Sequence, residues 1–150
     1  MLLALSPIAI TLGKILLAYL LTLPIGWERE KEVHSVGVRT FPIVAMASCA
    51  YLLLVASMDA ASQSRVLQGL IAGIGFVGGG AILKEGTTVR GTASAASIWN
   101  TGVLGAAVAL GRYDVAVILA LLNYFTLKVL WRYKQKLDQK EKPGAPGGSI

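Results

Sequence analysis

The chain has 150 residues, of which 55% are hydrophobic and 15% are charged, and its formal net charge is +6. A soluble domain usually carries about 25% charged residues, so this composition predicts a single all-α, polytopic membrane protein. Six of the fourteen Lys and Arg residues lie between Lys128 and Lys142, which argues against the basic folded face of a nucleic-acid-binding protein. One cysteine, Cys49, and one histidine, His34, are too few for an internal disulfide or a Cys/His metal centre.

Five apolar stretches predict about five transmembrane helices, because each is near the roughly 20 residues that cross a hydrocarbon core of about 30 Å. The predicted spans are residues 6–26, 41–58, 66–83, 93–110 and 113–131. They make up a predicted transmembrane domain over residues 1–131. Residues 132–150 form a short basic tail, and we expect its Pro/Gly-rich end to be disordered.

Positive charges in the connections predict the orientation of the spans. The first and third connections and the tail carry several Lys and Arg residues, whereas the second and fourth each carry one, Arg65 and Arg112. Positive connections stay on the cytoplasmic side, so we expect the N-terminus outside and the C-terminus in the cytoplasm.

The first span contains one charged residue, Lys14. A charge inside a membrane span is a candidate functional group. Lys14 lies close to the predicted outer end, however, and we expect its ammonium group to reach the outer surface along its own stem.

A charged run, Glu28-Arg-Glu-Lys-Glu32, follows the first span. It is either a solvated helix end or part of a cytoplasmic network in which Glu28 or Glu30 pairs with Arg39 or Arg90. The candidate functional cluster at this membrane face is Glu28, Arg29, Glu30, Arg39, Thr40 and Arg90. Thr40 is also a candidate N-cap for the second span.

The segment from Gly69 to Leu83 holds six glycines and no charge. Small residues let two membrane helices approach closely, so the sequence predicts the central packing helix of the bundle here. The predicted packing residues are Gly69, Gly73, Gly75, Gly78, Gly79 and Gly80. Residues 73–78 also match the G-x-G-x-x-G dinucleotide pattern, but the acidic residue that this motif needs about 20 positions later is missing.

The connection at residues 84–94 is rich in hydroxyl groups. Together with Arg90 it could hold an ion, but a turn in which Thr92 or Ser94 caps the fourth span is the favoured interpretation. In that span Ser94, Ser97 and Thr101 share one helical face, with Asn100 and Trp99 in the same turn. Such a polar face either binds a neighbouring helix or lines a polar cavity.

Three motifs in order resemble those of the MgtC/SapB family. They are Gly26-Trp-Glu-Arg-Glu30 with Gly37-Val-Arg-Thr40, the run Gly73-Ile-Gly-Phe-Val-Gly-Gly-Gly80, and Val89-Arg-Gly-Thr-Ala-Ser-Ala-Ala-Ser-Ile-Trp99. The resemblance implies a bacterial inner-membrane protein of about five spans, linked with growth at low magnesium. The residues that carry over are Glu28, Arg29, Glu30, Gly37, Arg39, Thr40, Gly73, Gly75, Gly78, Gly80, Gly91, Ala95, Ala96 and Trp99.

Three functions remain open from the sequence. The favoured one is a non-enzymatic regulator that contacts another membrane protein and lies in the lipid bilayer, with a homo-oligomer left open. The alternative is a transporter or channel for Mg²⁺ or another ion, which the absence of Asp and Glu from the span interiors disfavours. The third is an anion site built from Arg39 and Arg90. No catalytic constellation occurs, so we predict no catalytic residues, cofactor or metal.

Overall fold

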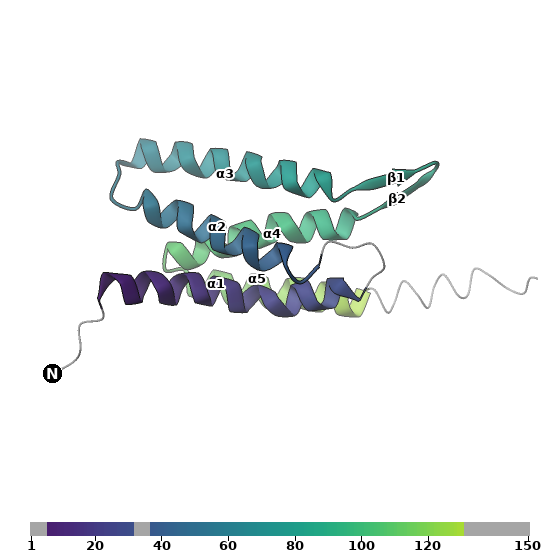
Figure 1. Cartoon of the computed structure of the whole chain (residues 1–150), viewed down its shortest axis with the longest axis horizontal. Helices are drawn as coiled ribbons and strands as arrows, with labels where there is room; N and C mark the ends of the chain where they lie inside the picture. The colour runs from purple at the N-terminus through teal and green to yellow at the C-terminus, as the bar shows by residue number, and fades with distance from the viewer. Residues whose placement is uncertain (1–5, 32–36, 131–150) are drawn as a thin grey trace, which may run out of the picture.

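The computed structural model describes residues 6–31 and 37–130 of the chain. It contains five helices: α1 (Pro7–Glu30), α2 (Thr40–Leu54), α3 (Ala60–Gly80), α4 (Thr92–Ala109) and α5 (Tyr113–Phe125), the last continued by a π-helical segment, η1 (Thr126–Leu130). The helices run alternately up and down one bundle (Figure 1). The predicted tail and His34 lie outside the described residues.

The five helices coincide with the five predicted spans to within a few residues. Among the described residues, two segments are long and apolar enough to cross a membrane: Pro7–Glu30 and Tyr113–Leu130. The segment Thr40–Leu54 is a shorter apolar helix. A mostly helical fold is therefore confirmed, while five crossings of the membrane stay a prediction.

Local sequence signals explain where the helices begin. Ser6 caps α1 by accepting a hydrogen bond from the backbone N–H of Ala9, and Pro7 takes the first helical position, which needs no N–H. Asp59 caps α3 by accepting from the N–H groups of Ala61 and Ser62. Thr40 is not the N-cap of α2: it is the first helical residue, and Arg39 occupies the cap position with no side-chain bond.

A two-stranded hairpin, β1 (Leu83–Glu85) and β2 (Thr88–Arg90), joins α3 to α4. Gly91 then starts α4 with a φ of 84°, a conformation that glycine adopts at little cost. The predicted cap by Thr92 or Ser94 is wrong, because Thr92 is already helical and no side chain caps this end. The left-handed glycine makes the turn instead.

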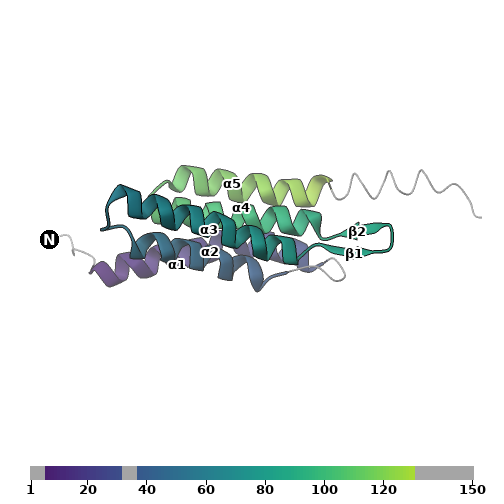
Figure 2. The same ribbon diagram turned by 90° about the horizontal axis from the view of Figure 1, so that it is seen from above.

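The central helix of the bundle is α4, which contacts α1, α2, α3 and α5. Figure 2 shows it between α5 on one side and α3 on the other. The prediction that the glycine-rich helix is central is wrong: in α3 only Ile74 and Gly78 are buried. The buried apolar side chains instead gather around α4, with Phe41 and Ile25 among the largest.

Candidate functional site

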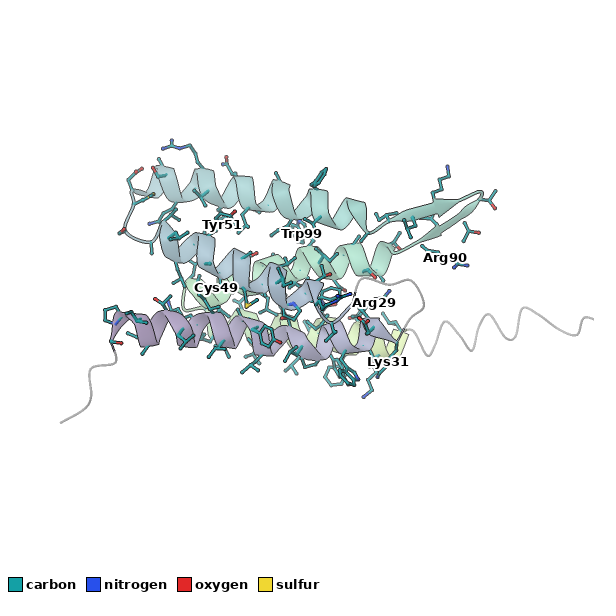
Figure 3. All side chains as sticks on the ribbon, viewed as in Figure 1. Arg29, Lys31, Cys49, Tyr51, Arg90 and Trp99 are labelled. Carbon is teal, nitrogen blue, oxygen red and sulfur yellow. The ribbon has the colours of Figure 1, made fainter. Side chains whose placement is uncertain are left out.

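Arg29 joins the C-terminal end of α1 to the N-terminal end of α4. Its side chain is almost fully buried, with 5% of its surface exposed. The guanidinium Nε and Nη2 donate to the hydroxyl oxygen of Ser94 at 3.1 and 2.9 Å, and Ser94 is fully buried. Hydrogen bonds from a charged donor are stronger than neutral ones, so this contact fixes how the two helices meet. Figure 3 shows Arg29 directed into the bundle.

Two glutamates flank Arg29 and bind locally. Glu28 forms an ion pair with Lys31 at 2.7 Å, one helical turn away. Glu30 accepts a hydrogen bond from the backbone N–H of Val38 at 2.8 Å. A side chain at Gly37 would collide with the Glu30 carboxylate, so glycine there allows the end of α1 to hold the segment that enters α2.

The two outer arginines of the predicted cluster lie elsewhere at the same end of the bundle. Arg39 is exposed at the start of α2, and Arg90 is exposed on β2, away from Arg29 in Figure 3. In the described part of the chain, no ion pair links either arginine to Glu28 or Glu30. The structure therefore divides the predicted cluster into a buried contact and two solvent-facing arginines. Its functional role stays a prediction.

The polar face of α4 is buried between helices. Ser94, Ser97 and Thr101 are each at most 3% exposed. Thr101 donates to the backbone carbonyl of Ser97, and Ser97 donates to Asn123 Oδ1 on α5 at 3.0 Å. Trp99 points away from this face, is half exposed and lines an apolar cavity. The hydroxyl groups of Ser94 and Ser97 therefore bind neighbouring helices, whereas that of Thr101 binds within α4, and Trp99 does not belong with them.

Five of the six predicted packing glycines have open space where a side chain would extend: Gly69, Gly73, Gly75, Gly79 and Gly80. Only Gly78 packs closely, because a Cβ atom there would lie 3.2 Å from the carbonyl oxygen of Ala95. The prediction that Gly73 and Gly75 pack inside the bundle is therefore wrong. Both are exposed, on two sides of α3 about 200° apart around the helix.

The close crossings involve glycines of α4 that the sequence interpretation missed. A Cβ atom at Gly105 would collide with the backbone carbonyl of Ala45, and one at Gly102 would collide with the side chain of Ile74. The pattern Gly102, Gly105, Ala106, Ala109 was a usable signal, since small residues three and four apart mark a close helix crossing.

Lys14 makes a contact with another helix. Its ammonium group donates to the carbonyl oxygen of Ala109, the last residue of α4, at 2.7 Å. The carbonyls of a final helical turn lack intrahelical partners and carry partial negative charge. Lys14 thus binds the end of the central helix, at the end of the bundle where α1 begins, a partner that the sequence interpretation did not identify.

Two cavities border α4. One of about 310 Å³ is almost wholly apolar and lies among α3, α4 and α5, with Trp99 and Arg112 on its lining. The other, of about 300 Å³, is a notch between α4 and the α5–η1 segment, mostly apolar but with Ser97, Asn100, Asn123 and Thr126 on its lining. The described residues hold no group of three or more His, Cys, Asp or Glu side chains that could bind a metal.

The chain is similar to known proteins over most of its length. A profile of the MgtC family matches residues 15–136. SrpB of Synechococcus elongatus is 33% identical over 81% of this chain and 74% of its own length. MgtC of Salmonella typhimurium is 30% identical over 83% of this chain, and YhiD of Escherichia coli is 26% identical over 85%.

The shared region covers 54% of the Salmonella MgtC protein and 63% of YhiD, so the chain spans little more than half of these two relatives. No solved structure matches the chain. The family match extends over most of the chain, from within α1 to the end of α5, with Arg29, Ser94 and the glycines of α3 and α4. The chain belongs to the MgtC family of membrane proteins.

Proposed function

We propose that this chain is a non-enzymatic protein of the bacterial inner membrane that acts by contacting another membrane protein during magnesium limitation or stress. Its relatives include the Escherichia coli protein YhiD, whose name links it with magnesium transport, and the Salmonella MgtC proteins. In the orientation favoured by the positive charges, the protein crosses the membrane several times with its C-terminus in the cytoplasm.

The observation that carries this proposal is the exposed surface of α3. Gly73 and Gly75 lie on two sides of this surface, neither with a neighbour within 4 Å of the position a Cβ would take, and Phe76, the next residue, is 86% exposed. A lipid-facing helix gains nothing from glycine, whereas a partner helix can approach such a face closely. Packing within the bundle does not explain these glycines, because no neighbouring residue approaches them. A binding surface for another membrane helix would explain them.

The alternative function is transport of Mg²⁺ or another ion. Mg²⁺ is bound by oxygen ligands in octahedral geometry, generally including one or two carboxylates. The carboxylates of the described helices lie at helix ends: Glu28 and Glu30 close to the end of α1, and Asp114 in the first turn of α5. The charges that lie within the bundle, the buried Arg29 and the half-buried Lys14, are cationic and bind protein oxygens. These positions favour the contact function over a cation path.

The test compares Gly73→Leu and Gly75→Leu with Gly13→Leu, a matched substitution on α1 where a Cβ also meets nothing within 4 Å. All three variants should fold, because each side chain would extend into open space. We expect the α3 variants to fail to support growth at low magnesium in a strain that depends on this protein, and Gly13→Leu to support it.

Purified protein in liposomes should leave the Mg²⁺ permeability unchanged, measured with an entrapped fluorescent indicator. Normal growth with both α3 variants would contradict the proposed contact surface. A protein-dependent Mg²⁺ flux would establish the transport alternative.

A further inference from the structure

A second surface, the notch of about 300 Å³ between α4 and the α5–η1 segment, has an unpaired amide on its lining. Asn123 lies in α5 and accepts a hydrogen bond from Ser97 through its Oδ1. Its Nδ2 has no hydrogen-bond partner among the described residues and is itself buried, so a docked group can reach it only after the carboxamide turns toward the notch. A buried amide N–H without a partner is costly, at about 1–3 kcal/mol, so this group calls for an acceptor, and none lies within hydrogen-bond distance in the described part of the single chain.

The depth of Asn123 limits what that acceptor can be. At 1.5 Å per residue, Asn123 lies about 15 Å along the helix from Tyr113 and about 10 Å from Leu130. In the segment Tyr113–Leu130, which is long enough to span a membrane, this position falls within the hydrocarbon layer. Lipid tails have no hydrogen-bonding groups there, whereas a polar side chain on a neighbouring helix can supply one.

The notch contains the matching group itself. Asn100 of α4 lines it beside Asn123, and its carboxamide has both a donor and an acceptor. Within the described residues Asn100 has no side-chain hydrogen bond of its own. Ala93 and Ala96 on the same lining are exposed and small, so the backbone of α4 can be approached closely.

We propose that a second copy of this chain docks on the notch in a two-fold symmetric dimer. In such an interface each contact occurs twice, so Asn123 of one copy pairs with Asn100 of the partner subunit, and the reverse. Rotating the Asn123 carboxamide would exchange its unpaired donor for an unpaired acceptor, and an asparagine partner satisfies either. The dimer does not use the exposed surface of α3 and stands apart from the proposed contact with another protein.

The experiment measures dimerisation of the full chain in lipid vesicles by energy transfer between donor-labelled and acceptor-labelled copies, over a series of lipid dilutions. We expect wild-type protein to dimerise. Asn123→Leu and Asn100→Leu should each raise the dissociation constant on the order of tenfold, since two symmetry-related hydrogen bonds are lost together. Ala96→Phe should block docking by filling the notch, and its exposed position leaves the monomer fold intact.

Phe76→Leu, on the exposed face of α3, is the control and should dimerise as wild type does. Circular dichroism and thermal unfolding identify any variant that fails to fold, and the three notch variants provide separate readings. Wild-type protein that stays monomeric at every dilution, with the notch filled by water alone, would overturn the proposal. So would notch variants that fold and dimerise like wild type.

Discussion

The helices α3 and α4 are both rich in small residues, yet they use them in opposite ways. In α4, eleven of eighteen residues are buried, including Gly102 and Gly105. In α3, two of twenty-one are buried. The difference shows that glycine content predicts that a membrane helix can be approached closely, but not which partner approaches it. The partner of α4 is the rest of the bundle, while the glycines of α3 other than Gly78 have open space beside them.

The sharpest test of this comparison is one substitution made in both helices. In Gly105→Ala the new Cβ collides with the backbone of Ala45, and such overpacking typically costs about 1–3 kcal/mol. In Gly73→Ala the Cβ enters open space, and alanine favours the helix by about 0.5–1 kcal/mol. We therefore expect changes of opposite sign in the free energy of unfolding, measured in detergent. Equal stability of the two variants would break the comparison.

The second prediction concerns the anchor of α4 at its N-terminal end. Arg29→Met removes both hydrogen bonds to Ser94 and leaves that buried hydroxyl without its donor. We expect a loss of about 2–3 kcal/mol in unfolding free energy, the range for bonds to a charged group. In a Ser94→Ala background the same substitution should cost less, because the pair is coupled. A double-mutant cycle without coupling energy would show that Arg29 does not hold α4.

The third prediction concerns the opposite end of α4. Lys14→Met keeps most of the stem but loses the bond to the carbonyl of Ala109. We expect a cost of about 1–2 kcal/mol, and Lys14→Arg should retain much of the lost stability because it remains a cationic donor. The check is thermal unfolding of both variants in the same detergent. A Lys14→Met protein as stable as wild type would mean that this bond contributes nothing to anchoring the helix.

Apolar runs of near-membrane length made the number and the approximate limits of the helices predictable. The burial of Ser94, Ser97 and Thr101 was also accessible, because steps of three and four place them on one face. Which helix forms the centre of the bundle could not be predicted, because a pattern of glycines does not say which helix faces pack against each other. The partner of Lys14 depends on α1 lying beside the end of α4, a contact between residues 95 positions apart.

The predicted cluster of Glu28, Arg29, Glu30, Arg39, Thr40 and Arg90 illustrates the same limit. Its residues do gather at one end of the bundle, as alternation of the spans requires. Their hydrogen-bond partners depend on local geometry that cannot be read from the sequence. Arg29 turns inward and binds the hydroxyl of Ser94, and Glu30 binds the backbone N–H of Val38. The hairpin carries Arg90 outward. The expected pairs of Glu28 or Glu30 with Arg39 or Arg90 do not form among the described residues, because charge complementarity alone does not choose the partners.

The smallest expected effect lies at the edge of the bundle, at the start of α3. The carboxylate of Asp59 accepts bonds from the N–H groups of Ala61 and Ser62 and, at 2.6 Å, from the Ser62 hydroxyl. These bonds, the hydroxyl bond first, lower the pKa of Asp59 below its ordinary value. Asp59→Ala should lower the melting temperature by only a few degrees at neutral pH, because α3 packs little against the bundle.

The pH dependence of this variant follows from the direction of the shift. A carboxyl group whose pKa is lower in the folded state contributes stability above its ordinary value of about 3.9, and this contribution is lost as the pH falls through the folded-state pKa. The difference between wild type and Asp59→Ala should therefore shrink below about pH 4. Ser62→Ala, which keeps the backbone bonds, should show a smaller difference at neutral pH. A difference that stays constant from pH 7 into the acid range would mean that the ionised carboxylate does not cap α3.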